Sequence, residues 1–179
     1  MKDPVIPKQI KIAFVGDLSV GKSSFVNYSL EDDEIIDYQG TTNLVDISFK
    51  KIKLRDTAII NFGMWDFSGN QDSIRIRTEL YPEFHAIAYC FDLSNKGSFN
   101  NLENNWIKEV KKYGGDKLIP ICIGMKSDKG KAVDFNLIQN FCQKYKMNYF
   151  ETSIKDGNSI KKFFFEFGNV LYDYVKGKK

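Results

Sequence analysis

Residues 16–23 read GDLSVGKS, and this stretch decides the fold. It fits the pattern G-x-x-x-x-G-K-[ST] at every fixed position, with an apolar run, Ile10 to Val15, before it and a helical pattern, Ser23 to Leu30, after it. Glycines let a backbone wrap closely around phosphate oxygens, and the amides at a helix N-terminus point at the anion. We therefore predict a phosphate cradle in which Lys22 supplies positive charge to the outer phosphates and Ser23 places its hydroxyl on Mg²⁺.

Apolar runs alternate with helical patterns on both sides of this loop. The expected strands are 10–15, 44–54, 58–65, 86–91, 118–123 and a short one from 149, and the expected helices are 23–30, 98–113, 135–145 and 159–174. Residues 44–54 and 58–65 are expected to form a hairpin that turns near Arg55 and Asp56, whereas Ala86 to Phe91 reads as a strand covered on both faces. The alternation predicts an α/β fold: a mostly parallel, six-stranded sheet flanked by helices. Ligands of such sheets bind beyond the carboxyl ends of the strands.

Composition limits the class of protein. A chain of 179 residues with 42% hydrophobic residues folds as one domain, for which we expect 10–175, preceded by a flexible leader, 1–9, and followed by a basic tail, 176–179. A net charge of +3 is too small to favour nucleic acid as a partner. Cys90, Cys122 and Cys142 have no paired spacing, so we expect buried thiols in a reduced, cytoplasmic compartment. No apolar run approaches the roughly 20 residues that span a bilayer.

Two later loops indicate which base the cradle accompanies. GMKSD at 124–128 and ETSIK at 151–155 each follow a predicted strand. The carboxylate of Asp128 can accept both the ring N–H and the amino hydrogens of guanine, whereas adenine would leave it unpaired. The stem of Lys126 can lie on the base, and a backbone N–H near Ile154 can donate to the guanine oxygen. These features favour a guanine nucleotide.

With these loops in view, the chain resembles the Ras-like small GTPases, and most closely the Rab branch. GDLSVGKSS is similar to the Rab cradle, WDFSGNQ at 65–71 to W-D-T-A-G-Q, GMKSD to N-K-x-D, and ETSIK to E-T-S-A-K. The similarity covers Lys11 to Tyr174 in the right order and spacing. It implies a P-loop small G domain that switches between GTP and GDP with Mg²⁺, hydrolyses GTP and acts in vesicle trafficking.

The resemblance also implies a set of site residues. Nucleotide would be bound by Asp17, Leu18, Ser19, Val20, Gly21, Lys22, Ser23, Ser24, Thr42, Gly69, Met125, Lys126, Asp128, Ser153, Ile154 and Lys155. Mg²⁺ would be held by Ser23, Thr42 and, through water, Asp66. Catalysis would involve Lys22, Thr42, Gly69, Asn70 and Gln71. Thr42 fits the offset to Val45-Asp46, whereas Thr41 fits the count from Tyr38, so both remain open as the first-switch threonine.

Three residues depart from the family pattern. Asn70 replaces the glutamine that orients water and is one methylene shorter, and a displacement of about an ångström can cost on the order of 10²-fold in rate. Leu18 takes the place of a small residue and would crowd the γ-phosphate. Met125 replaces an asparagine and loses one or two hydrogen bonds, roughly 1–3 kcal/mol. We therefore expect guanine binding with slow hydrolysis and reduced affinity.

The resemblance further implies partners. Exchange factors, GTPase-activating proteins and effectors would contact residues 35–50 and 65–82, with Trp65 at the effector surface. A monomer is expected, and membrane attachment only through a lipidated tail that these residues lack. The alternative function is a protein-interaction module that has lost productive nucleotide binding, which Met125 motivates; an ATP-using P-loop kinase is disfavoured by Asp128. His85 and Trp106 are expected to have packing roles.

Overall fold

The computed structural model describes residues 9–30, 44–54, 59–115 and 117–175, without the side chains of Gln71 and Val175. The expected leader, the basic tail, the Arg55-Asp56 turn and both candidate threonines, Thr41 and Thr42, lie outside these residues, so the predictions made for them stay predictions.

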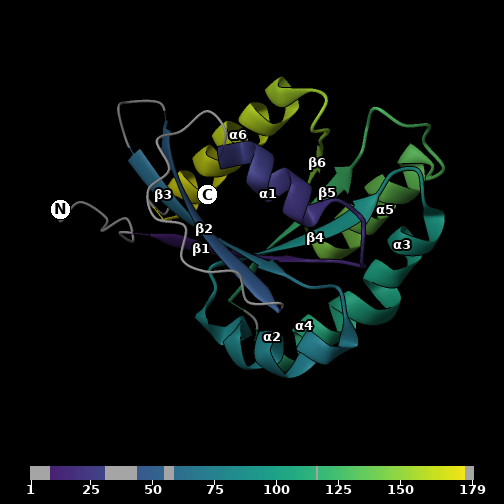
Figure 1. The fold of residues 1–179 in the computed structure, drawn as a ribbon, viewed down its shortest axis with the longest axis horizontal. Helices are drawn as coiled ribbons and strands as arrows, with labels where there is room; N and C mark the ends of the chain where they lie inside the picture. The colour runs from purple at the N-terminus through teal and green to yellow at the C-terminus, as the bar shows by residue number, and fades with distance from the viewer. Residues whose placement is uncertain (1–8, 31–43, 55–58, 116, 176–179) are drawn as a thin grey trace.

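The sheet has six strands in the order β2-β3-β1-β4-β5-β6 (Figure 1). Its strands are β1 (Ile10–Val15), β2 (Val45–Lys53), β3 (Ile59–Phe67), β4 (Ala86–Asp92), β5 (Ile119–Met125) and β6 (Asn148–Glu151). Only β2 and β3 pair antiparallel, and the remaining neighbours are parallel. The predicted α/β class, the mostly parallel sheet and the hairpin are confirmed.

Helices cover both faces of the sheet, with α1 and α6 on one face and α2 and α4 on the other (Figure 1). The helices are α1 (Lys22–Leu30), α2 (Ile74–Leu80), α3 (Lys96–Asn101), α4 (Ile107–Tyr113), α5 (Phe135–Tyr145) and α6 (Gly157–Val175). The short 3₁₀ turns η2 (Gln71–Ser73) and η3 (Tyr81–Glu83) flank α2. Alternate residues of β1 enter opposite cores: Ile12 and Phe14 pack in the core under α1 and α6, and Ala13 and Val15 in the core under α3, α4 and α5.

The predicted helix at 98–113 is continuous but is not one α-helix. It begins at Lys96, because the side chain of Asn95 accepts hydrogen bonds from the amides of Gly97 and Ser98. Its middle, Leu102–Trp106, is a π-helical segment, η4, in which the amide of Ile107 donates to the carbonyl of Leu102. A π segment inserts an extra residue into the turn, so the faces that precede and follow it are rotated relative to one another.

Helix α2 has no counterpart among the predicted helices. Its one buried residue is Arg77, and Ile74 on the same helix is 39% exposed. Because no apolar stripe marks it, the hydrophobic periodicity that revealed the other helices is missing here. This short helix follows the WDFSGNQ segment and carries residues that become important below.

Candidate guanine-nucleotide site

The cradle, residues 16–23, leaves the end of β1 and enters α1. Gly16 has a φ of 149°, and a Cβ there would lie 2.2 Å from the carbonyl oxygen of Cys90, so only glycine fits. Ser19 and Gly21 also have positive φ, at 62° and 114°. Successive amides in such alternating conformations form a concave donor surface suited to an anion.

Lys22 lies folded over this loop. Its Nζ donates to the carbonyl oxygens of Gly16 at 2.8 Å and Asp17 at 2.9 Å. Burial lowers the pKa of Lys22, although the nearby carboxylate of Asp66 acts in the opposite direction. Burial removes water from the charged ammonium, and the negative charge of a phosphate would stabilise it in return. A buried ammonium beside a ring of amides is therefore suited to bind a polyanion.

A cavity of about 580 Å³ opens between the cradle and the ends of the strands. Its lining is Leu18, Ser19, Gly21, Lys22, Ser23, Ser24, Leu44, Val45, Asp46, Asp66, Phe67, Ser68, Gly69 and Lys126. Most of the predicted phosphate and metal residues are therefore together. Leu18 lines this cavity and is 61% exposed.

Asp66 provides the test of whether Mg²⁺ fits. It is buried, and its Oδ1 accepts no hydrogen bond from the residues that the structure describes. Burial raises the pKa of Asp66, with Ser23 and Lys22 acting to lower it. A buried, unsatisfied carboxylate oxygen beside a serine hydroxyl and a phosphate cradle is the hard-oxygen environment that Mg²⁺ prefers. The described residues hold no group of three or more His, Cys, Asp and Glu side chains that could hold a metal ion, so this site would be completed by ligands of other kinds, such as phosphate oxygens, water and a threonine hydroxyl.

A second cavity, of about 190 Å³, adjoins the first one. It is lined by Gly21, Ser24, Phe25, Met125, Lys126, Asp128, Lys129, Thr152, Ser153, Ile154 and Lys155. The loops after β5 and β6 meet here because these strands are parallel neighbours whose carboxyl ends lie at one edge. The two loops predicted to read the base are thus brought together beside the cradle.

Asp128 is held in place on this cavity. It accepts a hydrogen bond from the hydroxyl of Ser153 and forms an ion pair of 3.2 Å with Lys155. These contacts lower the pKa of Asp128, and the hydrogen bond from Ser153 has the largest effect. Lys126 spans from the base loop to the cradle, donating to Ser19 O at 2.6 Å and to Asp92 Oδ2 at 2.7 Å. An ionised acid and an extended lysine stem are therefore ready at the base cavity.

Met125, the departure in the base loop, is buried. Its Sδ accepts a hydrogen bond from the Thr152 hydroxyl at 3.4 Å, and its Cβ lies 3.7 Å from the site that a Cβ on Gly21 would occupy. A thioether is only a weak acceptor and donates nothing. The link between base loop and cradle at this position is consequently apolar packing in place of an amide.

Asn70 does not line either cavity in this structure. Its Nδ2 donates to Asp72 Oδ2 at 2.9 Å, its Oδ1 accepts from the amide of Asp72 at 3.4 Å, and its own amide donates to Ser68 Oγ at 3.2 Å. Gly69, by contrast, faces the cradle: a Cβ there would be 2.5 Å from the amide nitrogen of Leu18. The expected γ-phosphate contact of Gly69 is compatible with this position, whereas Asn70 is bonded within its own turn.

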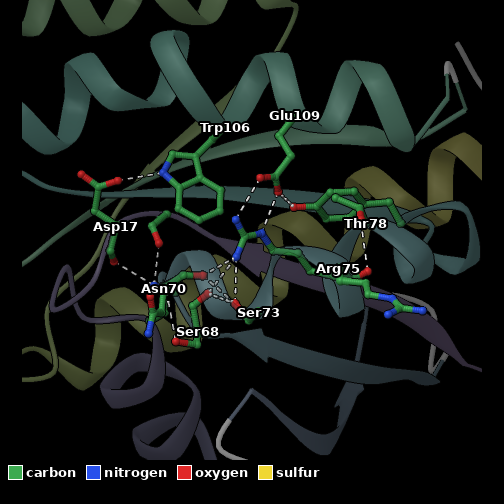
Figure 2. A network of polar contacts seen from close by, with 12 residues as sticks. Asp17, Ser68, Asn70, Ser73, Arg75, Thr78, Trp106 and Glu109 are labelled. Atoms are coloured by element: carbon green, nitrogen blue, oxygen red, sulfur yellow. Dashed lines mark hydrogen bonds and ion pairs between the residues drawn. The ribbon is translucent and has the colours of Figure 1, made fainter.

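Two further predicted residues face elsewhere. The carboxylate of Asp17 accepts from Asn101 Nδ2 at 2.7 Å and from Trp106 Nε1 at 2.8 Å, and Asp17 lines neither cavity. Val20 is 2% exposed and packs in the core under α1. Trp106, expected to pack within a helix, is buried but also holds the cradle through Asp17 (Figure 2).

The sequence reasoning missed a buried network behind the WDFSGNQ segment. Arg77 forms a bidentate ion pair with Glu109 on α4, and Tyr81 donates to Glu109 Oε1 at 2.6 Å. Burial, followed by the contacts with Glu109, raises the pKa of Tyr81 well above its usual range. No spacing in a single sequence marks these residues, because Arg77 and Tyr81 precede β4 in the sequence and Glu109 follows it.

Comparison with known proteins gives a consistent result. A model of the Ras family matches residues 11–173 of the chain. Ras-related protein Rab-1 of Theileria parva is 28% identical over 167 residues, which cover 92% of this chain and 75% of that protein. GTP-binding protein YPTM1 of Zea mays is 28% identical, with 86% and 74% covered, and GTP-binding protein YPT53 of Saccharomyces cerevisiae is 29% identical, with 90% and 76% covered.

Proposed function

The chain belongs to the Ras family of small GTPases, and from that premise we propose that it is a guanine-nucleotide switch of the Rab type that hydrolyses GTP slowly. Members of this family bind GTP and GDP with Mg²⁺, and their GTPases hydrolyse GTP. This chain is 28% identical to Rab-1 of Theileria parva, and its nucleotide-site residues determine how far it keeps those properties.

One observation carries the proposal: the phosphate cavity and the base cavity adjoin and share Gly21, Ser24 and Lys126. A single ligand with a phosphate chain at one end and a base at the other fits this arrangement. Lys126 touches the cradle through Ser19 O, so the binding of base and phosphate is coupled through one side chain. An arrangement that had lost nucleotide binding would have no reason to retain this continuity.

Guanine is the base that the second cavity favours. Asp128 is an ionised acceptor fixed by Ser153 and Lys155, and guanine presents two adjacent N–H groups to such an acceptor. Adenine presents no such pair, so it would make none of the hydrogen bonds that guanine can donate to this acceptor. The proposed ligand is therefore GTP or GDP.

Mg²⁺ would be held by Ser23 and Asp66 in the phosphate cavity, with Thr42 as the third expected residue. When bound, the ion neutralises charge on the phosphates. Of this chain's own groups, Lys22 binds the outer phosphates and the amide of Gly69 contacts the γ-phosphate. The cradle amides orient the chain of phosphates for attack.

Slow hydrolysis follows from what surrounds the γ-phosphate. Asn70 is a short amide bonded to Asp72, and Leu18 covers the cradle where a partner's arginine would have to enter. Rates without a partner are already on the order of 10⁻⁴ s⁻¹ in this fold. We expect the protein to remain GTP-bound for long periods unless a partner supplies a group that positions water.

Partner contacts are expected at residues 35–50 and 65–82, of which residues 44–46 and 66–69 line the phosphate cavity. Family members interact with exchange factors, GTPase-activating proteins and effectors, and the similarity to Rab proteins supports the proposal that this chain makes such contacts at the cytosolic face of membranes in vesicle trafficking. Among the described residues, no helix is both long and apolar enough to cross a membrane.

The direct test is to denature the purified protein and separate the released nucleotide by chromatography. GTP as the main species supports binding with slow turnover, and GDP supports binding with ordinary turnover. Heating the protein with and without GDP·Mg²⁺ gives a second measurement, because a bound ligand raises the melting temperature. ADP·Mg²⁺ is the matched control and should produce no shift.

Met125 favours a second candidate, an interaction module on the same fold without productive nucleotide binding. Its sulfur is already engaged by Thr152, so the usual polar link between base loop and cradle is replaced by packing. If the denatured protein releases no nucleotide and GDP·Mg²⁺ does not raise its melting temperature, the interaction module is favoured over the switch.

A further inference from the structure

Arg77 is a buried cation that no step described above uses. Its side chain is 1% exposed; Nε donates to Glu109 Oε1 at 2.7 Å and Nη2 donates to Glu109 Oε2 at 2.9 Å. Burial opposes the charge, but the hydrogen bonds and charge of Glu109 outweigh it and raise the pKa of Arg77. The guanidinium therefore remains charged, with its planar fork fixed on one carboxylate.

The third nitrogen of Arg77 points at the segment around Gly69. Nη1 lies 2.7 Å from Asn70 O, 2.8 Å from Ser73 Oγ and 3.5 Å from Ser68 O. Ser73 Oγ lies within 2.9 Å of Ser68 O and 2.8 Å of Asn70 O, but a hydroxyl has one hydrogen and can serve only one of them. The amide of Ser73 donates to Asn70 O at a longer 3.4 Å, and the two hydrogens of Nη1 supply the shorter contact to Asn70 O and a further donor for Ser68 O or Ser73 Oγ.

These contacts determine which way the peptide before Gly69 faces. In a planar trans peptide, the N–H points opposite to the C=O. With the carbonyl of Ser68 drawn to Ser73 and Arg77, the N–H of Gly69 is directed away from them. The α-carbon of Gly69 meanwhile packs so closely on the cradle that a Cβ would be 2.6 Å from the carbonyl carbon of Asp17.

The same guanidinium is linked to the other side of the cavity. Its Cζ lies 4.9 Å from the ring centroid of Trp106, and Trp106 Nε1 donates to Asp17 of the cradle (Figure 2). Figure 2 also shows Ser68, Asn70 and Ser73 gathered on one side of this network and Glu109 on the other. Arg77 thus contacts both the segment around Gly69 and Trp106, a residue bonded to the cradle. These two segments, the one around Gly69 and the cradle, form two walls of the phosphate cavity.

We propose that Arg77 is a positioning residue that fixes the peptide before Gly69 and the peptide after Asn70, and so sets the direction of the Gly69 N–H for the γ-phosphate. Its catalytic consequence rests on the proposed function, whereas its effect on residues 68–73 does not. Glu109 orients Arg77, and Arg77 itself touches no part of the nucleotide.

The test uses Arg77→Lys and Glu109→Gln, with Arg75→Lys as the matched control. A lysine offers one ammonium in place of the fork and cannot span Glu109 and both carbonyls. Arg75 lies on the same helix, but its side chain is 88% exposed and pairs only with Glu79 among the described residues, so its replacement leaves residues 68–73 untouched. Glu109→Gln keeps the shape of the partner of Arg77 and removes its charge. It tests the same proposal if Arg77→Lys does not fold.

Two measurements separate positioning from general stability. Hydrogen exchange of a peptide covering 68–73 should accelerate about tenfold in both variants while β4 and α6 remain protected, and should not change in the control. Affinity for a non-hydrolysable GTP analogue should fall about tenfold more than affinity for GDP, because only the analogue uses the Gly69 N–H.

Unchanged exchange at 68–73 in the folded variants overturns the proposal, and so does exchange that rises equally across the chain. Equal losses of affinity for GDP and the analogue overturn its catalytic part. If the protein binds no nucleotide at all, the proposed function fails, but the exchange measurement on the protein as purified still decides whether Arg77 holds residues 68–73.

Discussion

Asp46 and Asp66 lie directly opposite each other on β2 and β3, and each has a carboxylate oxygen that is buried without a hydrogen-bond donor among the described residues. Opposite residues of an antiparallel pair share one face of the sheet, and both line the phosphate cavity. Burial raises the pKa of Asp46, and the charge of Asp46 contributes to the raised pKa of Asp66. Two facing acids without a cation repel each other, so a divalent ion would relieve this arrangement.

We predict that Asp66→Asn lowers the affinity for Mg²⁺ about 10–100-fold and that Asp46→Asn lowers it by a smaller factor. The measurement is the Mg²⁺ concentration at which the GDP-induced rise in melting temperature is half complete. Asp173→Asn, on the exposed end of α6, is the control and should match the unmodified protein. An Asp46 variant that also matches it would show that Asp46 takes no part in holding the ion.

The second prediction concerns Asn70. Lengthening the side chain in Asn70→Gln should raise the single-turnover rate of GTP hydrolysis about 10- to 100-fold, because the amide can then reach past Asp72 toward the cavity. Leu18→Gly, made in parallel, reports the effect of crowding at the cradle. If only the Leu18 variant hydrolyses GTP faster, the side chain of Leu18 is the cause of slow hydrolysis. If the unmodified protein hydrolyses GTP as fast as an ordinary Rab, slow hydrolysis itself is contradicted.

Much of this fold could be predicted because its signals are local. The strand, glycine loop and helix at 10–30 appear in one continuous stretch, and the α5 prediction of Phe135–Tyr145 matches the observed bounds, where Asp134 caps one end and Lys146, with a φ of 53°, ends the other. The expectation that Cys90, Cys122 and Cys142 are buried and unpaired is confirmed. Each of these features depends on residues close in sequence or on simple burial.

The features that could not be predicted depend on contacts between distant segments. Helix α2 was missed because its buried residue is Arg77, and an arginine becomes a core residue only where Glu109 lies opposite it. The link from Trp106 to Asp17 crosses 89 positions of the chain, so no window of sequence contains it. The π-helical turn at Leu102–Trp106 was also invisible, because a 3.6-residue period does not indicate where an extra residue is inserted.

A third prediction follows from Met125. Met125→Asn should restore a polar link between base loop and cradle and strengthen GDP binding by about 1–3 kcal/mol, or roughly five- to 150-fold. The dissociation rate of a fluorescent GDP analogue measures the gain. Without nucleotide, the same variant should melt at a lower temperature, because a buried thioether is replaced by an amide that needs partners.

Met125→Leu is the control for that variant, since it keeps the volume and removes only the weak acceptor of Thr152. It should leave the dissociation rate within about twofold of the unmodified value. A similar gain in GDP affinity in both variants would show that the effect comes from repacking of the loop and not from a restored hydrogen bond.

The last prediction is a pH dependence that originates at His85. The amide of Lys11 donates to His85 Nδ1 at 3.1 Å, and the amide of His85 donates back to Lys11 O at 3.0 Å, so the imidazole helps to join β1 to the start of β4. Burial, and then the charge of Lys11, lowers the pKa of His85. Protonation would place a hydrogen on the nitrogen that now accepts one, so the folded protein favours the neutral ring.

The sign follows from linkage. The unfolded chain takes up the proton near pH 6.5, whereas the folded chain resists it until a lower pH, so stability from His85 is complete above about pH 6.5 and is lost as the pH falls toward the folded pKa. Between pH 8 and 5, the melting temperature of the GDP-bound protein should therefore decline more steeply than that of His85→Gln, whose amide oxygen can accept from Lys11 at every pH. The difference should amount to a few degrees. Lys11→Gln should lessen the decline, because removing the positive charge lets the pKa of His85 rise toward its ordinary value. Parallel curves for the unmodified protein and His85→Gln would rule out His85 as the source, leaving it a packing residue with no titration of consequence.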